Sequence, residues 1–400
     1  MSNLGDGVQL AAIPLLALLA DNSAISAGIV VIARVVPAML LAGPIGVVVD
    51  YHNRFAVAIM ANVIRVIALI AASLAWLFAT DVELWHLIVL SLVLGGVEPL
   101  FETSVGAAIP QVVSGSALHK YNSVISFVQT FANGVVGPVL GASLFTLNAN
   151  LPLLFNSALL VGASLTLLPF LAATPKPVDY QPGDTDDSDR WRKKVLAGLI
   201  IIRKNPLLVA LLCLTAGWNL IGWMPEGPLA YYVTVEIGAS DTAYSWILAT
   251  TSIGSLVGAS LAPLARTAKA RVGVLVASTP IYGAAFVLIY FSPNIWVSAL
   301  IFGLQGLPLM LWAITSTTLR QKLIDNRYLG RVNVVFYSTS IVLGPLGMAL
   351  GSAFAEVSSA RNIFLVAGSL LCALAAAILG WSISPGARAT RRALAQALKD

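Results

Sequence analysis

Long apolar stretches, each with the length of a helix that crosses a lipid bilayer, make up most of this 400-residue sequence. A transmembrane helix needs about 20 consecutive apolar residues. By this criterion the twelve predicted spans are 2–20, 25–49, 55–78, 85–109, 121–147, 151–171, 207–233, 244–265, 272–291, 295–319, 333–356 and 362–384. Only 10% of the residues are charged, against roughly 25% in a soluble domain. The sequence therefore predicts an all-α integral membrane protein with twelve transmembrane helices.

One long connection, at about 172–206, divides the predicted spans into two groups of six. It carries an acidic stretch and then a basic one, and its segment 195–204 is predicted to be a short amphipathic helix at the membrane interface. The predicted organisation is an N-terminal six-helix bundle (1–171), a cytoplasmic linker with an amphipathic helix (172–206), a C-terminal six-helix bundle (207–384) and a basic cytoplasmic tail (385–400).

The distribution of positive charge predicts the orientation of the chain. With both termini placed inside, 20 of the 23 Lys and Arg residues fall in inside segments. Arg361 is in an outside loop, and Arg34 and Arg65 lie within spans. Because Lys and Arg are enriched in cytoplasmic loops, we expect a multi-pass protein of the cytoplasmic (inner) membrane with both termini in the cytoplasm. This bias also explains the net charge of +5, so no nucleic-acid partner is expected.

The residue types that usually carry catalysis are scarce and scattered. Cys213 and Cys372 lie in apolar runs, and His52, His86 and His119 fall at predicted helix ends. Their spacing matches no metal motif, and no Walker-type phosphate-binding loop is present. We therefore expect no catalytic residue, no metal and no cofactor, which argues against an embedded enzyme and against an ATP-driven pump. A membrane sensor that does not transport stays open as an alternative from another class.

The two halves of the chain resemble each other in matching places. The stretch PQVVSGSALHKYNSV follows the fourth span, and RQKLIDNRYLGRVNVV follows the tenth. A Gly-Pro pair lies inside the next span in both cases, and its small residues allow helices to approach closely. The predicted helix-packing residues are Gly137, Pro138, Gly141, Gly344, Pro345 and Gly347. This arrangement predicts a duplicated fold, as in many transporters.

The end of the second span, GPIGVVVDYHNRF, resembles the signature G-x-x-x-D-x-x-x-R of major facilitator transporters, with Gly46, Asp50 and Arg54 in the matching positions. The segments SNLGDGVQLAAIPLLA, LRQKLIDNRYLGRVN and GPLGMALG are similar to the bacterial exporter branch that includes the enterobactin exporter and macrolide-efflux proteins. This resemblance implies two pseudo-repeated six-helix bundles, a monomer, and alternating access around a midplane site.

In that family the signature loop is expected to act as a latch that breaks when the two halves rock. An Asp at a helix end can accept hydrogen bonds from the backbone N–H groups of a neighbouring helix N-terminus. The candidate gating residues are Gly46, Asp50, Arg54, Arg320, Gln321, Gly330 and Arg331. Two departures stand out: Tyr51 replaces a basic residue, and Met1 directly precedes Ser2 where family members have a longer cytoplasmic arm. An ordinary solvated turn is the alternative for this loop.

Six ionisable residues are predicted to lie within the spans, where each costs about 2.5–3.5 kcal/mol on insertion scales and is a functional candidate. They are Asp6, Arg34, Arg65, Glu98, Glu102 and Glu226. Four acids against two bases leave at least two acids without a fixed cation, and these are candidates for proton exchange.

Glu98 and Glu102 share one helix face. The resemblance implies that the first, fourth, seventh and tenth helices, which hold all four acids, line a central cavity. The alternative is structural: Arg34 or Arg65 pairs with Glu98 or Glu102 and ties helices together.

Aromatic and polar residues on the same helices are candidates for the substrate cavity: Gln9, Trp218, Asn219, Trp223, Gln305, Trp312 and Thr315. Tryptophans can stack on flat or cationic ligands, although most tryptophans in membrane helices only pack or anchor. The predicted function is a proton-coupled antiporter that exports a drug-like lipophilic small molecule. An exporter of a siderophore or another specific metabolite, and a uniporter or importer of the same fold, are the alternatives.

Overall fold

The computed structural model describes residues 1–78, 83–112, 117–171, 187–292 and 294–383, and all regular elements of these segments are helices. Among the described residues, ten helices are long and apolar enough to cross a membrane, or up to twelve if each of two bent helix pairs is counted as one span. The all-α membrane fold predicted from the sequence is thus confirmed. The predicted tail at 385–400 and most of the linker before α9 lie outside the described residues.

Most helices begin and end within about four residues of the predicted bounds, whereas α15 begins seven residues before the predicted span 333–356 and α10 ends eleven residues before the end of the span 207–233. The first-half elements are α1 (Ser2–Ala20), α2 (Ala24–Leu40), α3 (Ala42–Tyr51), α4 (Arg54–Phe78), α5 (Leu84–Val112), α6 (Ala117–Phe131), η1 (Ala132–Val136), α7 (Gly137–Leu147), α8 (Leu151–Leu167) and η2 (Leu168–Phe170). The remaining elements are α9 (Asp187–Lys204), α10 (Pro206–Gly222), α11 (Leu229–Tyr231), η3 (Tyr232–Glu236), α12 (Asp241–Leu261), η4 (Ala262–Leu264), α13 (Ala268–Tyr290), α14 (Ile295–Leu323), α15 (Asn326–Val357) and α16 (Ala360–Ile383).

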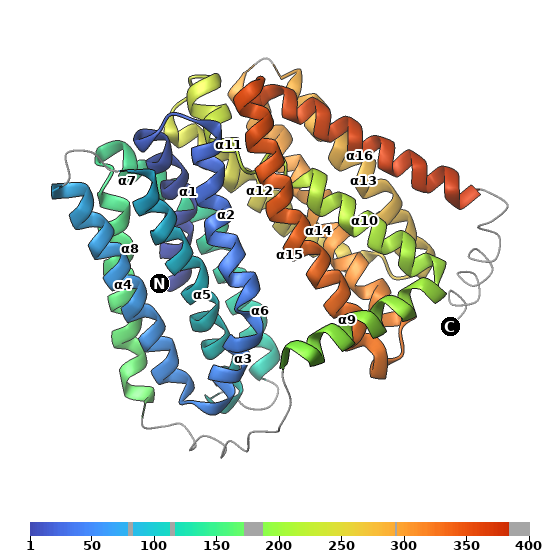
Figure 1. Cartoon of the computed structure of the whole chain (residues 1–400), viewed down its shortest axis with the longest axis horizontal. Coiled ribbons are helices and arrows are strands. Elements are labelled where there is room, and N and C mark those ends of the chain that lie inside the picture. The colour runs from blue at the N-terminus through green and yellow to red at the C-terminus, as the bar shows by residue number, and fades with distance from the viewer. Residues whose placement is uncertain (79–82, 113–116, 172–186, 293, 384–400) are drawn as a thin grey trace. The chain divides into compact units, whose positions relative to one another are not determined.

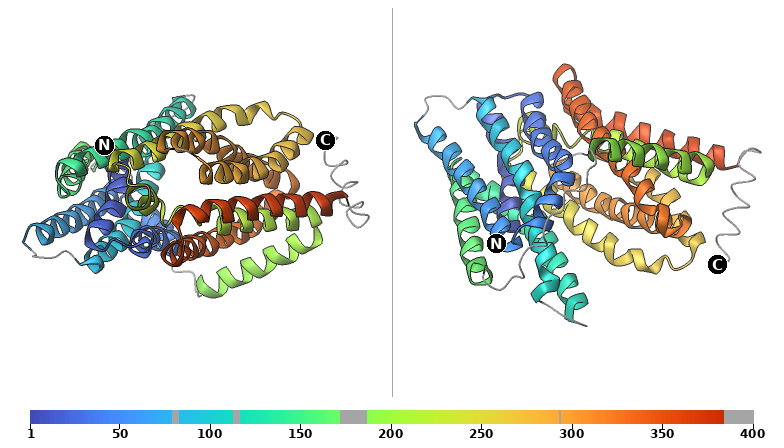
Figure 2. Two further views of the ribbon diagram at one scale, coloured as in Figure 1. Left: turned by 90° about the horizontal axis from the view of Figure 1, so that it is seen from above. Right: turned by 60° about the horizontal axis from the view of Figure 1, so that its bottom comes forward.

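The chain forms two compact units. The first comprises Met1–Pro182 and Gly227–Ser252, and the second comprises Gly183–Glu226 and Ile253–Asp400. The first unit contains α1 to α8, whose long helices run side by side (Figures 1 and 2). Segment 227–252, assigned from the sequence to the C-terminal bundle, groups with the first unit. The predicted amphipathic segment 195–204 forms the second half of α9.

Helix packing repeats between the two halves. In the first unit α1 packs against α7 and α8, and α4 packs against α5 and α8. In the second unit α10 packs against α15 and α16, and α13 packs against α14 and α16. Counted as predicted spans, the first and seventh therefore have equivalent neighbours, and so do the third and ninth. This shared pattern supports the duplication that the sequence predicts.

Glycines bring corresponding helices close together in both units. A Cβ added to Gly141 of α7 would lie 2.3 Å from the carbonyl oxygen of Val8 in α1. A Cβ added to Gly347 of α15 would lie 2.2 Å from the carbonyl oxygen of Leu220 in α10. Both distances are shorter than a carbon–oxygen contact permits, so these crossings require glycine.

Three predicted spans are interrupted within their length by a bend, a π-helix or turns. The second is bent by 57° between α2 and α3, and the fifth contains the π-helix η1 between α6 and α7. The seventh, predicted as one helix over 207–233, ends at Gly222 and continues through turns to α11. Pro225 and Pro228 lie in these turns. Proline lacks the backbone N–H that a helix interior needs, which explains the break.

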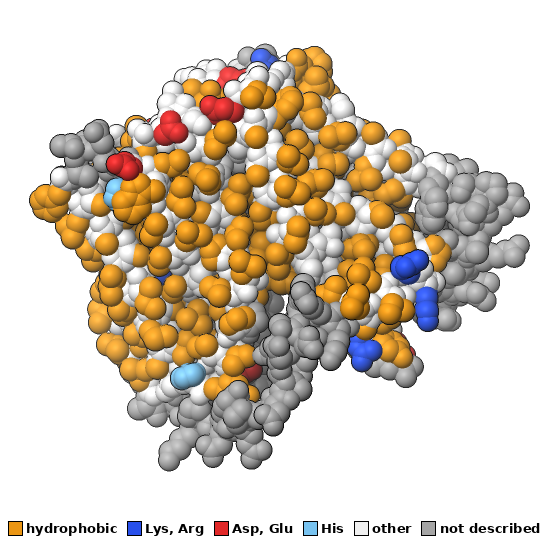
Figure 3. Space-filling model, viewed as in Figure 1, with side chains coloured by type: hydrophobic (Ala, Val, Ile, Leu, Met, Phe, Trp, Pro, Cys, Tyr) orange, Lys and Arg blue, Asp and Glu red, His pale blue; other side chains and the backbone are white. Residues whose placement is uncertain are grey.

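The surface of the helices suits a lipid environment. In Figure 3, hydrophobic side chains cover most of the visible face, and the few charged ones lie near helix ends. Large apolar side chains point outward from many helices, such as Phe78 at 79% exposure and Leu147 at 76%. Such extensive apolar exposure is unusual for a protein in water and is expected for helices in a bilayer.

Candidate functional site

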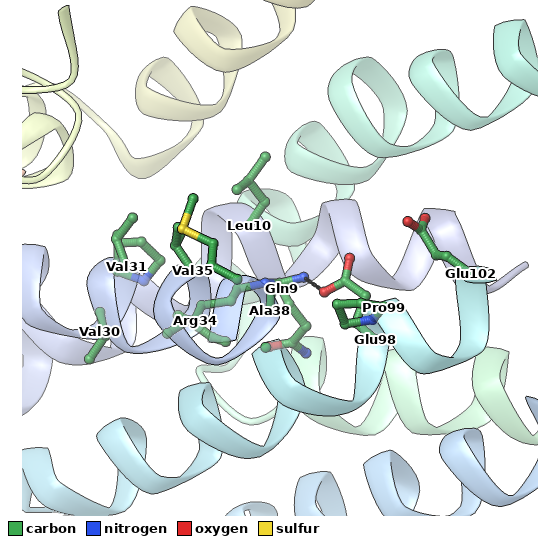
Figure 4. Close-up of a pocket in the computed structure, with 14 residues that line it drawn as sticks. Gln9, Leu10, Val30, Val31, Arg34, Val35, Ala38, Glu98, Pro99 and Glu102 are labelled. Atoms are coloured by element: carbon green, nitrogen blue, oxygen red, sulfur yellow. Dashed lines mark hydrogen bonds and ion pairs between the residues drawn. The ribbon is translucent and has the colours of Figure 1, made fainter. Parts of the chain in front are cut away.

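A cavity of about 340 Å³ opens in the first unit between α1, α2 and α5 (Figure 4). Apolar side chains form most of its wall, among them Leu10 and Val35. The charged lining residues are Arg34, Glu98 and Glu102. Three of the six ionisable residues predicted within the spans therefore meet at one cavity.

Arg34 and Glu98 form an ion pair across this cavity. Arg34 Nη2 donates to Glu98 Oε2 at 2.9 Å, and the two side chains are 16% and 18% exposed. Gly95 makes the pair possible, because a Cβ there would lie 1.8 Å from the Arg34 carbonyl oxygen. Helices α2 and α5 therefore approach closely at Gly95, and Arg34 of α2 reaches the carboxylate of Glu98, which lies almost one turn further along α5. The pair ties the two helices together and leaves little net charge.

Glu102 lies one turn beyond Glu98 and has a different environment. Its side chain is exposed and accepts a hydrogen bond from Asn3 Nδ2 at 3.1 Å. Among the described residues, no Lys or Arg nitrogen lies within 4.0 Å of its carboxylate. Figure 4 shows it apart from the dashed Arg34–Glu98 contact. The cavity therefore carries one more negative than positive side chain.

Asp6 and Arg65 form a second ion pair, buried between α1 and α4. Arg65 Nη2 donates to Asp6 Oδ1, and each side chain is only 1% exposed. Arg65 Nη1 also donates to Ser2 Oγ at 3.1 Å and to Asn62 Oδ1 at 3.5 Å. Neither charged residue of this pair lines the cavity. This buried ion pair therefore links α1 to α4 and has a structural arrangement.

A second cavity of about 320 Å³ adjoins the first and shares Leu10 and Glu102 with it. Its other lining residues are Asn3, Gln129, Thr130, Asn133 and Gly134, from α1, α6 and η1. The sequence analysis missed this polar cluster. Gln129 and Asn133 are four residues apart and so share one face of a helix. Two amides on one face of an apolar span could have identified this polar cluster from the sequence.

Two of the three tryptophans proposed for the cavity, Trp218 and Trp312, lie in the core of the second unit. The rings of Trp218 and Trp312 stack with centroids 4.8 Å apart, and the residues are 4% and 7% exposed. Trp218 Nε1 donates to Thr279 Oγ1 at 3.0 Å, and its ring lies 4.3 Å from that of Tyr282. The described contacts of these tryptophans are those of a packed cluster joining α10, α13 and α14.

The other cavity candidates have mixed environments. Gln9 is 1% exposed, lines the first cavity and donates to the Pro152 carbonyl at 3.2 Å. Gln305 and Thr315 are each 3% exposed in α14. Asn219 donates to the backbone of its own helix, while Trp223 is exposed just after α10.

Glu226 lies in the turns that follow α10 and is half-buried. Its backbone N–H donates to the Trp223 carbonyl at 3.2 Å. No described Lys or Arg lies within 4.0 Å of its carboxylate. Glu226 therefore lies where the seventh predicted span is broken, and its role in proton exchange stays a prediction.

The candidate gating residues lie at helix ends. Arg54 Nη1 donates to the Ala107 carbonyl at 2.7 Å, which ties the start of α4 to α5. Asp50 is exposed at the end of α3, and Gly46 has open space around it. The guanidinium of Arg320 lies 4.3 Å from the centre of the Phe336 ring. Gln321, Gly330 and Arg331 are exposed. A latch between the halves stays a prediction for these residues.

Comparison with known proteins places the chain in a family. The sequence model of the Major Facilitator Superfamily matches residues 1–226. The chain is 24% identical to the multidrug efflux pump Tap of Mycolicibacterium fortuitum over 372 residues, covering 90% of this chain and 88% of that protein. It is 23% identical to macrolide efflux protein A of Streptococcus pyogenes, over 83% of this chain and 82% of that one.

Solved structures share the fold. A bacterial homologue of the iron transporter ferroportin, in an inward-facing state, superposes with a TM-score of 0.71 at 18% identity and 96% coverage of both chains. The nucleoside transporter NupG superposes with a TM-score of 0.69 at 14% identity, over 96% of this chain and 97% of that one. The family and these relatives are transporters and not enzymes, as the sequence predicts. The chain belongs to the Major Facilitator Superfamily and is a multi-pass membrane transporter.

Proposed function

We propose that this transporter exports a lipophilic, drug-like cation in exchange for protons. The observation that carries the proposal is the environment of Glu102: a carboxylate beside a mostly apolar cavity, with no described cation within 4.0 Å. An unpaired charge in a bilayer is costly, so a ligand that supplies the missing cation has a strong advantage over a neutral one. An anionic ligand would instead compete with Glu98 for Arg34.

Proton coupling follows from the same carboxylate in this proposal. A proton and a cationic substrate neutralise the same charge, so their binding to Glu102 is mutually exclusive. Glu98 also takes part in this proposal. When the substrate or the proton leaves Glu102, the electric field changes at the neighbouring Arg34–Glu98 ion pair, in which the nitrogen and oxygen atoms are 2.9 Å apart. Exclusive binding at one site is sufficient for exchange when that site alternates between the two sides of the membrane.

The relatives support a drug-like substrate. Multidrug efflux pump Tap and macrolide efflux protein A are named as efflux proteins, and this chain aligns with most of their length. We further propose that the protein lies in the cytoplasmic membrane with both termini in the cytoplasm, functions as a monomer in the bilayer, and needs no nucleic acid or cofactor.

Export of a fluorescent lipophilic cation from cells that lack their own drug pumps tests the proposal. Wild-type protein is expected to lower the retained dye, and a protonophore should abolish the difference. Glu102→Gln keeps the size and the hydrogen bond from Asn3 but removes the charge. We expect this variant to lose at least tenfold in dye export while it reaches the membrane in normal amount.

Glu356→Gln, which changes an exposed acid on α15 of the second unit that lines neither cavity, is the matched control. Glu226→Gln tests whether Glu226, the other in-span acid with no described Lys or Arg within 4.0 Å, contributes to export independently of Glu102. Dye export that persists in the presence of the protonophore would exclude proton coupling. Unchanged export by Glu102→Gln would remove this carboxylate from the mechanism.

A further inference from the structure

The two adjoining cavities of the first unit differ sharply in chemistry. The cavity between α1, α2 and α5 is lined mainly by apolar side chains. Arg34 binds Glu98 there and Gln9 donates to the Pro152 carbonyl, while Arg34 Nη1 and Gln9 Oε1 have no hydrogen-bond partner among the described residues. The cavity between α1, α5, α6 and η1 has fewer apolar side chains in its wall than the first cavity, and it is lined by side-chain amides and a hydroxyl. Glu102 lines both.

The amides of the second cavity are available for a ligand. Within the described part of the chain, neither Gln129 nor Asn133 makes a side-chain hydrogen bond, and both side chains are half-buried. Each offers two donors and one acceptor. Thr130 donates its hydroxyl to the Ser126 carbonyl at 2.8 Å, which leaves its oxygen free to accept. Half-buried amides in an apolar span are costly unless something satisfies them.

The π-helix η1 fixes the position of these groups. It starts at Ala132, directly after α6, and contains Asn133. Its backbone is held by α1, because a Cβ on Gly7 would lie 2.4 Å from the Asn133 carbonyl oxygen. Single π-turns inside α-helices occur frequently at functional sites. Asn133 therefore lies on an irregular helical segment that packs closely against α1, and such packing helps to position a binding group.

We propose that the transported compound is an amphipathic amine with a polar end rich in hydroxyl or amide groups, and that the cavity of Gln129 and Asn133 binds this end. Its apolar body occupies the cavity between α1, α2 and α5, and its ammonium group lies at Glu102, where the two cavities meet. This inference rests on the proposed function, because it extends the site of Glu102. It adds a substrate class that an apolar pocket with one carboxylate would not select.

Two tertiary amines with the same octyl chain provide the test: N-octyl-N-methylglucamine, which carries a polyol, and N,N-dimethyloctylamine, which does not. Binding of each to the purified full-length protein in lipid nanodiscs is measured by titration calorimetry, without reliance on transport. Empty nanodiscs correct for partitioning into lipid. Wild type should bind the polyol amine about tenfold more tightly, because its hydroxyl groups can form hydrogen bonds with the amides of Gln129 and Asn133.

Gln129→Leu and Asn133→Leu, singly and together, should reduce the ratio of the two affinities, to about one in the double variant. Ser126→Ala, on an exposed position of α6 outside both cavities, should retain the wild-type ratio. Thermal unfolding establishes that each variant is folded. Gln129→Ser, which replaces the amide with a smaller hydroxyl that can still form a hydrogen bond, provides a milder second variant and should give an intermediate ratio.

Two results would overturn the inference: equal affinity of wild type for both amines, or an unchanged affinity ratio in the folded double variant. Failure of the proposed function looks different. If the polyol amine binds with the predicted preference but dye is not exported, the substrate class stands and proton-coupled export is wrong. If dye is exported through Glu102 but the polyol gives no advantage, export stands and the polar cavity has another role.

Discussion

The two arginines within the spans differ in what surrounds them. Arg65 is 1% exposed and is paired with Asp6, Ser2 and Asn62. Arg34 is part-buried, lines a cavity and reaches one carboxylate of two that share a face of α5. An arginine that is fully enclosed has no route to a ligand, whereas one at a cavity can respond when its neighbour changes charge.

The buried pair gives a prediction for stability. Asp6→Asn removes the anion and leaves Arg65 charged in the core, which should lower the free energy of unfolding by about 3–5 kcal/mol. Adding Arg65→Met removes the second charge as well and should restore much of that loss, because a buried pair can often be replaced by apolar groups. Unfolding of the purified protein in detergent, followed by circular dichroism, measures both effects. A double variant as unstable as Asp6→Asn would show that the arginine is not held by this carboxylate.

At this scale the sequence indicated the charged residues but not their partners. Ionisable groups are conspicuous in apolar spans, so Arg34, Arg65, Glu98 and Glu102 could be named from composition alone. Which arginine meets which acid depends on helix neighbours and on Gly95, whose missing side chain lets α2 approach α5. Spacing along one helix contains no information on such contacts between helices. The amides of the second cavity were missed for another reason, since uncharged polar residues are tolerated in many spans.

Among the helices, close crossings depend on glycine at particular positions. Gly141→Ala should destabilise the first unit by about 1–3 kcal/mol, as overpacking does, because the new Cβ would lie 2.3 Å from the Val8 carbonyl oxygen. Gly351→Ala should do the same in the second unit, where the Met224 carbonyl oxygen is 1.8 Å away. Thermal unfolding in detergent measures each change.

Gly106→Ala is the matched control for these crossings. It also lies inside a helix, α5, but a Cβ there meets nothing within 4 Å. Alanine favours a helix over glycine by up to about 1 kcal/mol, so this variant should be neutral or slightly more stable. If all three substitutions destabilised equally, the loss would stem from glycine in general and not from the helix crossings.

Apolar length predicted the helices well and their interruptions poorly. α1, α4 and α16 match the predicted spans within two residues at each end. The π-helix η1 has no such signal, because its residues, ANGVV, continue the apolar stretch. The break after Gly222 could be anticipated from Pro225 and Pro228, but its extent depends on the packing of the turn residues. Pro225 and Gly227 there are buried.

In the whole chain, one arginine departs from the expected charge distribution, and its contacts explain why. Arg361, in a predicted outside loop, donates Nε to the Tyr290 carbonyl at 2.7 Å and Nη2 to the Ser292 carbonyl at 2.9 Å. Tyr290 is the last residue of α13. A cation at the C-terminal end of a helix satisfies free carbonyls and opposes the helix dipole. This arginine therefore has a structural reason to be there and does not weaken the predicted orientation.

That orientation can be tested with single cysteines in a chain carrying Cys213→Ala and Cys372→Ala. Ser240→Cys lies in an exposed segment predicted outside, and His52→Cys in an exposed segment predicted inside. Because 20 of 23 Lys and Arg residues fall on the predicted inside and such residues are retained in the cytoplasm, an impermeant maleimide should label Ser240→Cys on intact cells. His52→Cys should react only after the membrane is opened. The opposite pattern would reverse the topology, and with it the direction in which Glu102 would deliver its substrate.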